Sequence, residues 1–325
     1  MAAYLTRRLV QSLFILFAVS LASFWILRAA PGDPVEMYLS EPFHQTPPAV
    51  IAAVRHQLGL DQPTYVQYGR WLAAFLRGDM GYSLVTHAAV AGEIADALPK
   101  TFLLMSVATG FGLLAGILLG VWSALRPNGA ADTVLASFAA VGFAVPQFWV
   151  GLVLIYLLSY VWPMLPSSGM MNAYALSPTT RDVAVHLVLP AATLAVNEVA
   201  YWQRYQRDSL LKELTAEYVR TARAKGLRGI VVVFRHAWPN SLVAIVTLLG
   251  LSLTRLIAGS YIVETIFSWP GMGYLGISAV DNRDYPVVMA ILMVSAVLTL
   301  AGNFLADLLH TVVDPRVRLP AAKPR

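Results

Sequence analysis

Long apolar stretches recur along this chain, and their length constrains its fold more than any other feature. A helix of about 20 apolar residues matches the thickness of the hydrocarbon core of a bilayer. Only 13% of the 325 residues are charged and 58% are hydrophobic, whereas a soluble domain carries roughly 25% charged residues. Soluble helices rarely stay apolar on every side over several turns. The sequence therefore predicts an all-α, polytopic membrane protein without a β-sheet.

Six such stretches predict six transmembrane helices. The first is longer than the roughly 7–15 apolar residues of a signal peptide, and cleavage after Ala30 would place the bulky Arg28 where a small residue is required. We therefore expect an uncleaved anchor. The third stretch is long and carries Pro146 near its middle, where a kink is expected. The six stretches cover residues 9–27, 101–125, 132–162, 186–203, 241–262 and 286–310.

The distribution of Lys and Arg predicts the orientation of the chain. If the N-terminus is inside, the outer segments hold only five of the 23 Lys and Arg residues, namely Arg55, Arg70, Arg77, Arg181 and Arg283. The positive-inside rule then places both termini in the cytoplasm. Orientation also explains the net charge of +5, so we expect no nucleic-acid partner. The absence of cysteine excludes disulfides and thiolate metal sites.

The predicted spans divide the chain into four parts. Residues 1–30 form an N-terminal transmembrane anchor helix, and residues 31–99 form an extracytoplasmic segment. A five-helix core follows at 100–310 and contains a long cytoplasmic loop at 204–239. Residues 311–325 form a cytoplasmic tail.

The extracytoplasmic segment carries signals for two short amphipathic helices. Pro47 and Pro48 suit the first turn of one helix, which Gly59 can close in a left-handed conformation. Asp61 can cap a second helix, which Gly78 ends. We expect both helices to lie along the outer membrane interface. A separate ligand-binding domain is the alternative, although a short segment without disulfides offers only a small core.

A stripe of small residues marks the second span. Gly112, Gly116 and Gly120 recur at every fourth position, and such a stripe lets another helix approach closely. We expect this helix to pack inside the bundle, with a dimer interface as the alternative.

Polar residues interrupt the fourth and fifth spans. Asn197 and Glu198 lie in the fourth span and Arg255 lies in the fifth. A charge in mid-membrane costs at least ~2.5–3.5 kcal/mol on insertion scales, so each should face a partner or a wet cavity. These three residues are candidates for the translocation path. A structural ion pair or a hydrated helix surface is the alternative.

The loop at 204–239 has an ordered composition. Asp208 and Ser209 can cap a helix that continues to Ala224, with Gly226 as its stop. A second short helix is expected at 230–237, and Pro239 opens the fifth span; the exposed face is basic through Arg220, Arg223 and Lys225. A basic loop that only holds anionic lipid is the alternative, but it does not explain the glycine and proline positions.

The motif Arg220-Thr221-Ala222, followed by Gly226 and then by His236-Ala237-Trp238-Pro239, resembles the EAA loop of binding-protein-dependent ABC importer permeases. Arg220 stands where that family has Glu, and His236 and Trp238 stand where it has Ile and Leu. These departures match the peptide/nickel subfamily, whose loop reads Arg-Thr-Ala followed by Arg-His-Ala.

Further motifs resemble the B-type subunit of that subfamily, in the same order along nearly the whole chain. They are Pro31-Gly32-Asp33-Pro34, Leu58-Gly59-Leu60-Asp61, Gly78-Asp79-Met80-Gly81, the element with Glu264, Phe267, Pro270, Gly271 and Gly273, and Asp314-Pro315-Arg316.

The resemblance implies a type I ABC importer permease in a bacterial or archaeal inner membrane. Its partners would be a homologous permease, two ABC ATPases, an extracytoplasmic binding protein and membrane lipid. ATP and Mg would be held by the ATPases, with no cofactor in this chain. The element at 264–273 would form part of the outer mouth. The ATPase-coupling loop would use Arg220, Thr221, Ala222, Arg223, Lys225, Gly226, His236 and Pro239.

The resemblance points to di- or oligopeptides as the substrate, with nickel chelates and glutathione as alternatives. Two other classes of protein are the alternatives. A membrane enzyme would need a nucleophile with a base, or metal ligands, but the chain has no H-E-x-x-H, G-x-S-x-G or phosphate-binding G-x-x-x-x-G-K-[ST] motif. We therefore expect no catalytic or metal site. A secondary transporter or channel that works alone is the remaining class.

Overall fold

The computed structural model describes residues 2–29, 35, 39, 46–57, 59–172, 179–252 and 260–313. Three predictions from the sequence fall outside these residues: the Pro31–Pro34 motif, Arg255 and the Asp314–Arg316 motif. Parts of the predicted span at 241–262 and of the tail at 311–325 also lie outside them.

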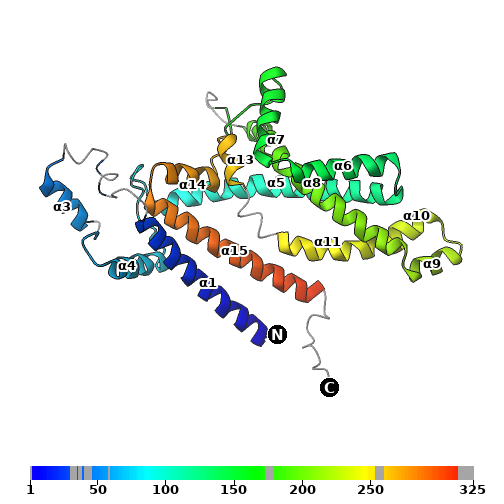
Figure 1. Cartoon of the computed structure of the whole chain (residues 1–325), viewed down its shortest axis with the longest axis horizontal. Coiled ribbons are helices and arrows are strands. Elements are labelled where there is room, and N and C mark those ends of the chain that lie inside the picture. The colour runs from blue at the N-terminus through cyan, green and yellow to red at the C-terminus, as the bar shows by residue number, and fades with distance from the viewer. Residues whose placement is uncertain are drawn as a thin grey trace. The chain divides into compact units, whose positions relative to one another are not determined.

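All regular elements among the described residues are helices, as predicted, and these residues contain no strand beyond one isolated bridge between Tyr82 and Ala89. Figure 1 shows the order of the elements along the chain. The helices are α1 (Ala2–Ala29), α3 (Pro48–Gln57), α4 (Thr64–Leu76), α5 (Val90–Leu125), α6 (Ala130–Ala144), α7 (Gln147–Ile155), α8 (Thr180–Leu214), α9 (Glu217–Ala224), α10 (Gly229–Val231), α11 (Trp238–Ser252), α13 (Tyr261–Ile266), α14 (Met272–Asp281) and α15 (Tyr285–Val313), with π-helical turns η2 (Tyr156–Val161) and η3 (Val232–Ala237).

Four of these helices are long and apolar enough to cross a membrane: residues 6–29 of α1, all of α5 and α8, and residues 285–306 of α15. The pair α6 and α7–η2 passes the same test as one broken span. The predicted fifth span begins in α11, which has 15 residues before the chain leaves the described part. Within that part, four or five of the six predicted spans are therefore accounted for.

The chain forms two compact units. One combines Met1–Thr101 with Pro270–Leu300, and the other combines Phe102–Trp269 with Ala301–Arg325. The boundaries fall inside α5 and α15, so each of these helices contributes to both units.

In the first unit, α4 packs against α1 through aromatic side chains. Tyr68 and Trp71 of α4 contact the ring of Phe24, with centroid distances of 5.4 and 6.1 Å. The Tyr68 hydroxyl also shares a hydrogen bond of 2.9 Å with the hydroxyl of Ser20. The α4 helix is therefore fixed along the span of α1.

Glycines end the helices of this segment as predicted, because Gly59 and Gly78 have φ values of 66° and 84°, which favour glycine. The prediction that Asp61 caps α4 is wrong. Pro63 occupies the N-cap position without a side-chain hydrogen bond. Asp61 Oδ2 lies 2.7 Å from His56 Nδ1 instead, and this hydrogen bond lowers the pKa of Asp61.

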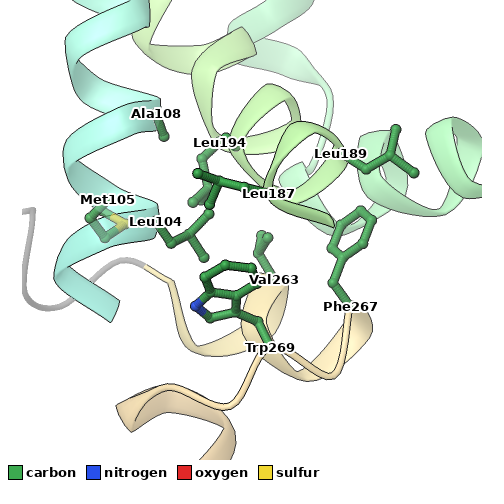
Figure 2. Close-up of a cluster of buried hydrophobic side chains, with 10 residues drawn as sticks. Leu104, Met105, Ala108, Leu187, Leu189, Leu194, Val263, Phe267 and Trp269 are labelled. Atoms are coloured by element: carbon green, nitrogen blue, oxygen red, sulfur yellow. The ribbon is translucent and has the colours of Figure 1, made fainter. Parts of the chain in front are cut away.

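In the second unit, α8 is the central helix and packs against α6, α7 and α11. A buried apolar cluster joins its first half to α5 and α13 (Figure 2), and Trp269 in this cluster is fully buried. The labelled members of the cluster are Leu104, Met105 and Ala108 from α5, Leu187, Leu189 and Leu194 from α8, and Val263, Phe267 and Trp269 from α13 and the turn after it.

The glycine stripe of α5 faces α8. A Cβ atom added at Gly112 would lie 2.4 Å from Glu198 Cβ, and one at Gly116 would lie 2.5 Å from Trp202 Cβ. At Gly120 it would lie 2.7 Å from a backbone oxygen of α8. Only glycine permits such an approach, so the expected packing inside the bundle is confirmed.

The third span bends far more than a proline kink. Its two halves, α6 and α7–η2, meet at 103°. Pro146 is the N-cap residue of α7, and Val145 ends α6 in an extended conformation. Proline lacks the N–H that would continue the helix, and the chain changes direction there.

Candidate functional site

Arg220 and Arg223 of the predicted coupling loop lie on α9, and Lys225 is its C-cap residue. The α9 helix follows α8, and α10 and η3 connect it to α11 (Figure 1). Arg220, Thr221, Arg223 and Lys225 are exposed. The Arg220 guanidinium forms a 2.8 Å ion pair with Glu217, one turn earlier, but both side chains are mostly exposed. Such a pair contributes little to stability and leaves a basic surface.

The opposite face of α9 is locked into the chain. Val219 and Ala222 are buried in an apolar cluster, with Val219 fully buried. The rest of this cluster comes from Val121 and Ala124 of α5, Leu210 of α8, and Val232 and Ala237 of η3. Ala222 therefore packs against helices of its own chain.

Gly226 ends α9 in the left-handed region, with φ of 77°. Its N–H donates to the Arg223 carbonyl (2.9 Å), and the Leu227 N–H reaches back to the Ala222 carbonyl (3.4 Å). These bonds satisfy carbonyls that the helix end leaves open. The predicted role of Gly226 as a helix stop is confirmed.

The second part of the loop is π-helical, because η3 runs from Val232 to Ala237 and continues directly into α11. His236 is half-buried, and its carbonyl accepts a hydrogen bond of 2.9 Å from Asn240 Nδ2. Pro239 is exposed in the first turn of α11. Both residues thus lie where the loop enters the span.

The prediction that Asp208 and Ser209 begin the basic helix is wrong. The α8 helix continues past them to Leu214, and α9 starts only at Glu217. The Ser209 hydroxyl donates to the Ser241 carbonyl of α11 at 3.0 Å. Because the Ser209 side chain bonds to a neighbouring helix, it does not cap a new helix at this position. The α8 helix therefore continues as one helix until shortly before α9 begins.

A buried ion pair that sequence reasoning missed holds α6 to α8. Arg207 of α8 contacts Asp132 of α6 with nitrogen–oxygen distances of 2.6 and 2.8 Å. Asp132 also accepts hydrogen bonds from the Ser123 hydroxyl and, at 2.8 Å, from the Asn128 N–H. The signal in the sequence was an acidic residue at the start of an apolar stretch, in a chain with few charges.

Tyr218, on the side of α9, adds a contact to the end of α8. Its hydroxyl donates to the Glu213 carboxylate. Partial burial of the phenol and this hydrogen bond raise the pKa of Tyr218. The contact ties the start of α9 to α8.

The candidate path residues separate in the structure. Asn197 lines a cavity of about 700 Å³ together with residues 143–148 and 261–263. Glu198 is half-buried, faces Gly112 of α5 and accepts a 2.9 Å hydrogen bond from Trp202 Nε1. Arg255 lies outside the described residues.

The predicted outer-mouth residues are mainly buried. Glu264 and Phe267 belong to the second unit, where Glu264 is fully buried and accepts a hydrogen bond of 2.5 Å from the Ser260 hydroxyl. Pro270, Gly271 and Gly273 belong to the first unit, where both glycines are buried. These side chains stabilise the fold, and their place at an outer mouth stays a prediction.

Within the part of the chain that the structure describes, no group of three or more His, Asp or Glu side chains could hold a metal ion.

Two family models match the chain and together cover most of it. Residues 116–319 match the model described as the binding-protein-dependent transport system inner membrane component. Residues 1–105 match the model of its N-terminal region.

Curated relatives align over the full length. The oligopeptide transport system permease protein AppB of Bacillus subtilis is 40% identical over 322 residues, which cover 98% of this chain and 99% of the relative. The di/tripeptide transport system permease protein DppB of Pseudomonas aeruginosa is 37% identical over 335 residues, which cover 98% and 99%.

Solved structures share the fold at low sequence identity. A chain of the MetNI methionine ABC transporter in an inward-facing conformation matches with a TM-score of 0.54 and 17% identity, covering 68% of this chain and 96% of that one. A chain of an amino acid ABC transporter matches with a TM-score of 0.51 and 19% identity, covering 67% and 92%. The likeness is to the fold of importer permeases.

Proposed function

Because the chain belongs to the family of binding-protein-dependent transport system inner membrane components, we propose that it is the permease subunit of an ATP-driven importer of short peptides. It forms the translocation path with a homologous second permease. An extracytoplasmic binding protein delivers the substrate, and two cytoplasmic ATPases hold ATP and Mg and drive the cycle.

Relatives named as oligopeptide and di/tripeptide permeases, 40% and 37% identical over 98% of the chain, support the choice of peptides. Nickel chelates and glutathione remain the alternative cargoes for the same machinery. The charge distribution supports cytoplasmic termini and a cytoplasmic α9 in the inner membrane.

One observation carries the proposed coupling role: α9 is exposed and basic on one face and buried on the other. The exposed face offers Arg220, Arg223 and Lys225 to an ATPase. The buried face joins α5, α8 and η3 in one apolar cluster. Close-packed interiors transmit strain. A force applied to α9 therefore reaches the spans α5 and α8 and, through η3, the start of α11. The permease itself performs no chemistry.

Gly226 provides the test. Its φ of 77° disfavours a side chain, whereas nothing lies within 4 Å of an added Cβ atom. Gly226→Val should therefore distort the end of α9 without a clash and should abolish peptide-stimulated ATPase activity in the assembled complex. The readouts are co-purification of the subunits and ATP hydrolysis in proteoliposomes.

Gly226→Asn is the matched control, because asparagine tolerates the left-handed conformation better than a β-branched residue. It should retain most of the stimulated activity. Equal and full activity in both variants would contradict the coupling role of α9.

A further inference from the structure

The break in the third span opens onto a cavity in the middle of the second unit. The cavity measures about 700 Å³ and is lined by residues 143–148 and 261–263 and by Asn197. Asn197 is the eighteenth residue of α8, which starts at Thr180 and has 35 residues. The cavity therefore lies about halfway along a helix that can cross the membrane.

The backbone at this break is unusually polar for a membrane span. The last carbonyls of α6 and the first N–H groups of α7 have no partner within their own helices, and Pro146 has no N–H at all. Irregular backbone at membrane depth persists only where protein buries it or water fills the space beside it. The cavity beside the break, which Gln147 and Asn197 line together with apolar side chains, offers water such a space.

Asn197 adds an unused hydrogen-bonding group. Its Oδ1 is buried and finds no hydrogen-bond partner among the described residues. A buried amide oxygen without a partner costs free energy, and rotation of the amide about the Cβ–Cγ bond can turn it toward the cavity. A ligand that brings a donor to this position would remove that cost.

The lining also restricts which ligand fits. Among the residues that line the cavity, none is Asp, Glu, Lys, Arg or His; Gln147, Asn197 and Tyr261 are polar, and the others are apolar. The lining therefore offers no imidazole that could bind a nickel ion directly. Amide side chains instead pair with the N–H and C=O groups of a peptide backbone, which are the same whatever the side chains of the peptide.

We propose that this cavity is a subsite of the translocation path that binds the backbone of the transported peptide, with Asn197 as the residue that hydrogen-bonds to it. Phe143, Phe148 and Ile262 provide apolar surface for the side chains of the peptide. The inference rests on the proposed function, since it requires a peptide path that a second permease completes.

The first experiment uses the complete importer in proteoliposomes, with its binding protein, its ATPases and trialanine. Asn197→Leu keeps the branched shape of the side chain and removes its hydrogen bonds. It should lower trialanine uptake about tenfold, the effect of one hydrogen bond to a ligand, while trialanine still stimulates ATP hydrolysis. Asn197→Gln, which keeps the amide, should restore much of the uptake.

Normal uptake by Asn197→Leu would overturn the inference and leave the proposed function standing. A wild-type complex that lacks trialanine-stimulated ATP hydrolysis would overturn the proposed peptide function, and the inference with it.

The second experiment does not depend on the Asn197 variants. The chain has no cysteine, so a single Ala144→Cys substitution in the cavity lining can be labelled selectively with a charged thiol reagent. Val141→Cys is the control, because Val141 is 59% exposed on the same helix but does not line the cavity.

We expect Ala144→Cys to react at least about tenfold faster than Val141→Cys, because charged reagents reach wet surfaces and not lipid. Trialanine in the transporting complex should slow the reaction. If Ala144→Cys reacts no faster than Val141→Cys, the cavity has no preferential access to water; if it reacts rapidly but trialanine gives no protection, the cavity does not bind the peptide. Either result overturns the inference.

Discussion

Asn197 and Glu198 are neighbours in the sequence but lie in opposite environments on α8. Asn197 lines an open cavity at the broken span. Glu198 faces α5, where a Cβ atom on Gly112 would lie 2.4 Å from its own Cβ. At this level α8 is thus packed to backbone contact on the side of α5, whereas Asn197 borders a cavity. A polar residue within a span therefore says little about a path until the face that carries it is known.

The comparison extends along the whole helix. The tight side continues through Gly116 and Gly120, each within contact of α8. On the other side, α6 is held at its start by the ion pair of Asp132 with Arg207 and ends at the break beside Asn197. The α5–α8 pair is therefore closely packed, and the opening on the other side begins at the break after Gly142, which itself packs against Ala200 of α8.

The largest effect is expected from placing a larger residue in the close contact between α5 and α8. A Cβ atom at Gly116 meets Trp202 Cβ at 2.5 Å and two backbone atoms of α8 at 3.0 Å, so none of these neighbours can move easily. Gly116→Leu should cost more than the roughly 1–3 kcal/mol of ordinary overpacking. We expect almost no folded protein after detergent extraction, as measured by size-exclusion chromatography.

Gly110→Leu is the matched control on the same helix, because a Cβ atom at Gly110 meets nothing within 4 Å. It should be extracted like the wild type. If both variants behave alike, the close α5–α8 contact does not exist in the membrane.

A smaller effect is expected at the anchored end of α6. Arg207→Met leaves Asp132 as a charge without a partner, and the Asp132 side chain is only 4% exposed. Removing one partner of a buried pair costs 3–5 kcal/mol, and because Arg207 is 24% exposed we expect about 2–3 kcal/mol. Thermal unfolding of the purified protein measures the loss.

Arg220→Met serves as the comparison, since its ion pair with Glu217 is exposed. This change should alter the free energy of unfolding by less than about 1 kcal/mol. Equal losses in the two variants would contradict the buried character of the Asp132 pair.

The smallest effect is expected at Glu198. Glu198→Gln keeps an oxygen that can accept the hydrogen bond from Trp202 Nε1 and keeps nearly the same volume against Gly112. Stability should change by less than about 1 kcal/mol, and peptide uptake should stay near the wild-type rate. A strong loss of uptake with normal stability would place Glu198 in the translocation path. It would then contradict the proposed difference in role between Glu198 and Asn197.

The sequence predicts the spans well because their apolar length is a local property. The predicted span at 186–203 is shorter than the helix that contains it, because α8 covers residues 180–214. The helix continues into polar residues that contacts with neighbouring helices hold in place. The cap at Asp208 and Ser209 fails for the same reason. Pro146 marks the position of the break, but the 103° angle depends on packing against other helices.

The candidate site, like the fold, is only partly predictable from the sequence. The basic face of α9 and the stop at Gly226 follow from local chemistry. Local chemistry does not reveal whether Asn197 or Glu198 faces the cavity. That depends on the rotation of α8 about its axis, which is set by the glycine stripe of α5. The ion pair of Asp132 with Arg207 joins residues 75 positions apart, and local patterns do not reveal such a partner.

The glycine stripe also has an evolutionary consequence. Gly112, Gly116 and Gly120 leave no room for a larger residue, because an added Cβ atom would meet Cβ or backbone atoms of α8 that a smaller side chain there does not remove. These three positions should therefore stay glycine across related permeases. Aligned relatives would show this invariance, and that record could be tested without any experiment on this protein.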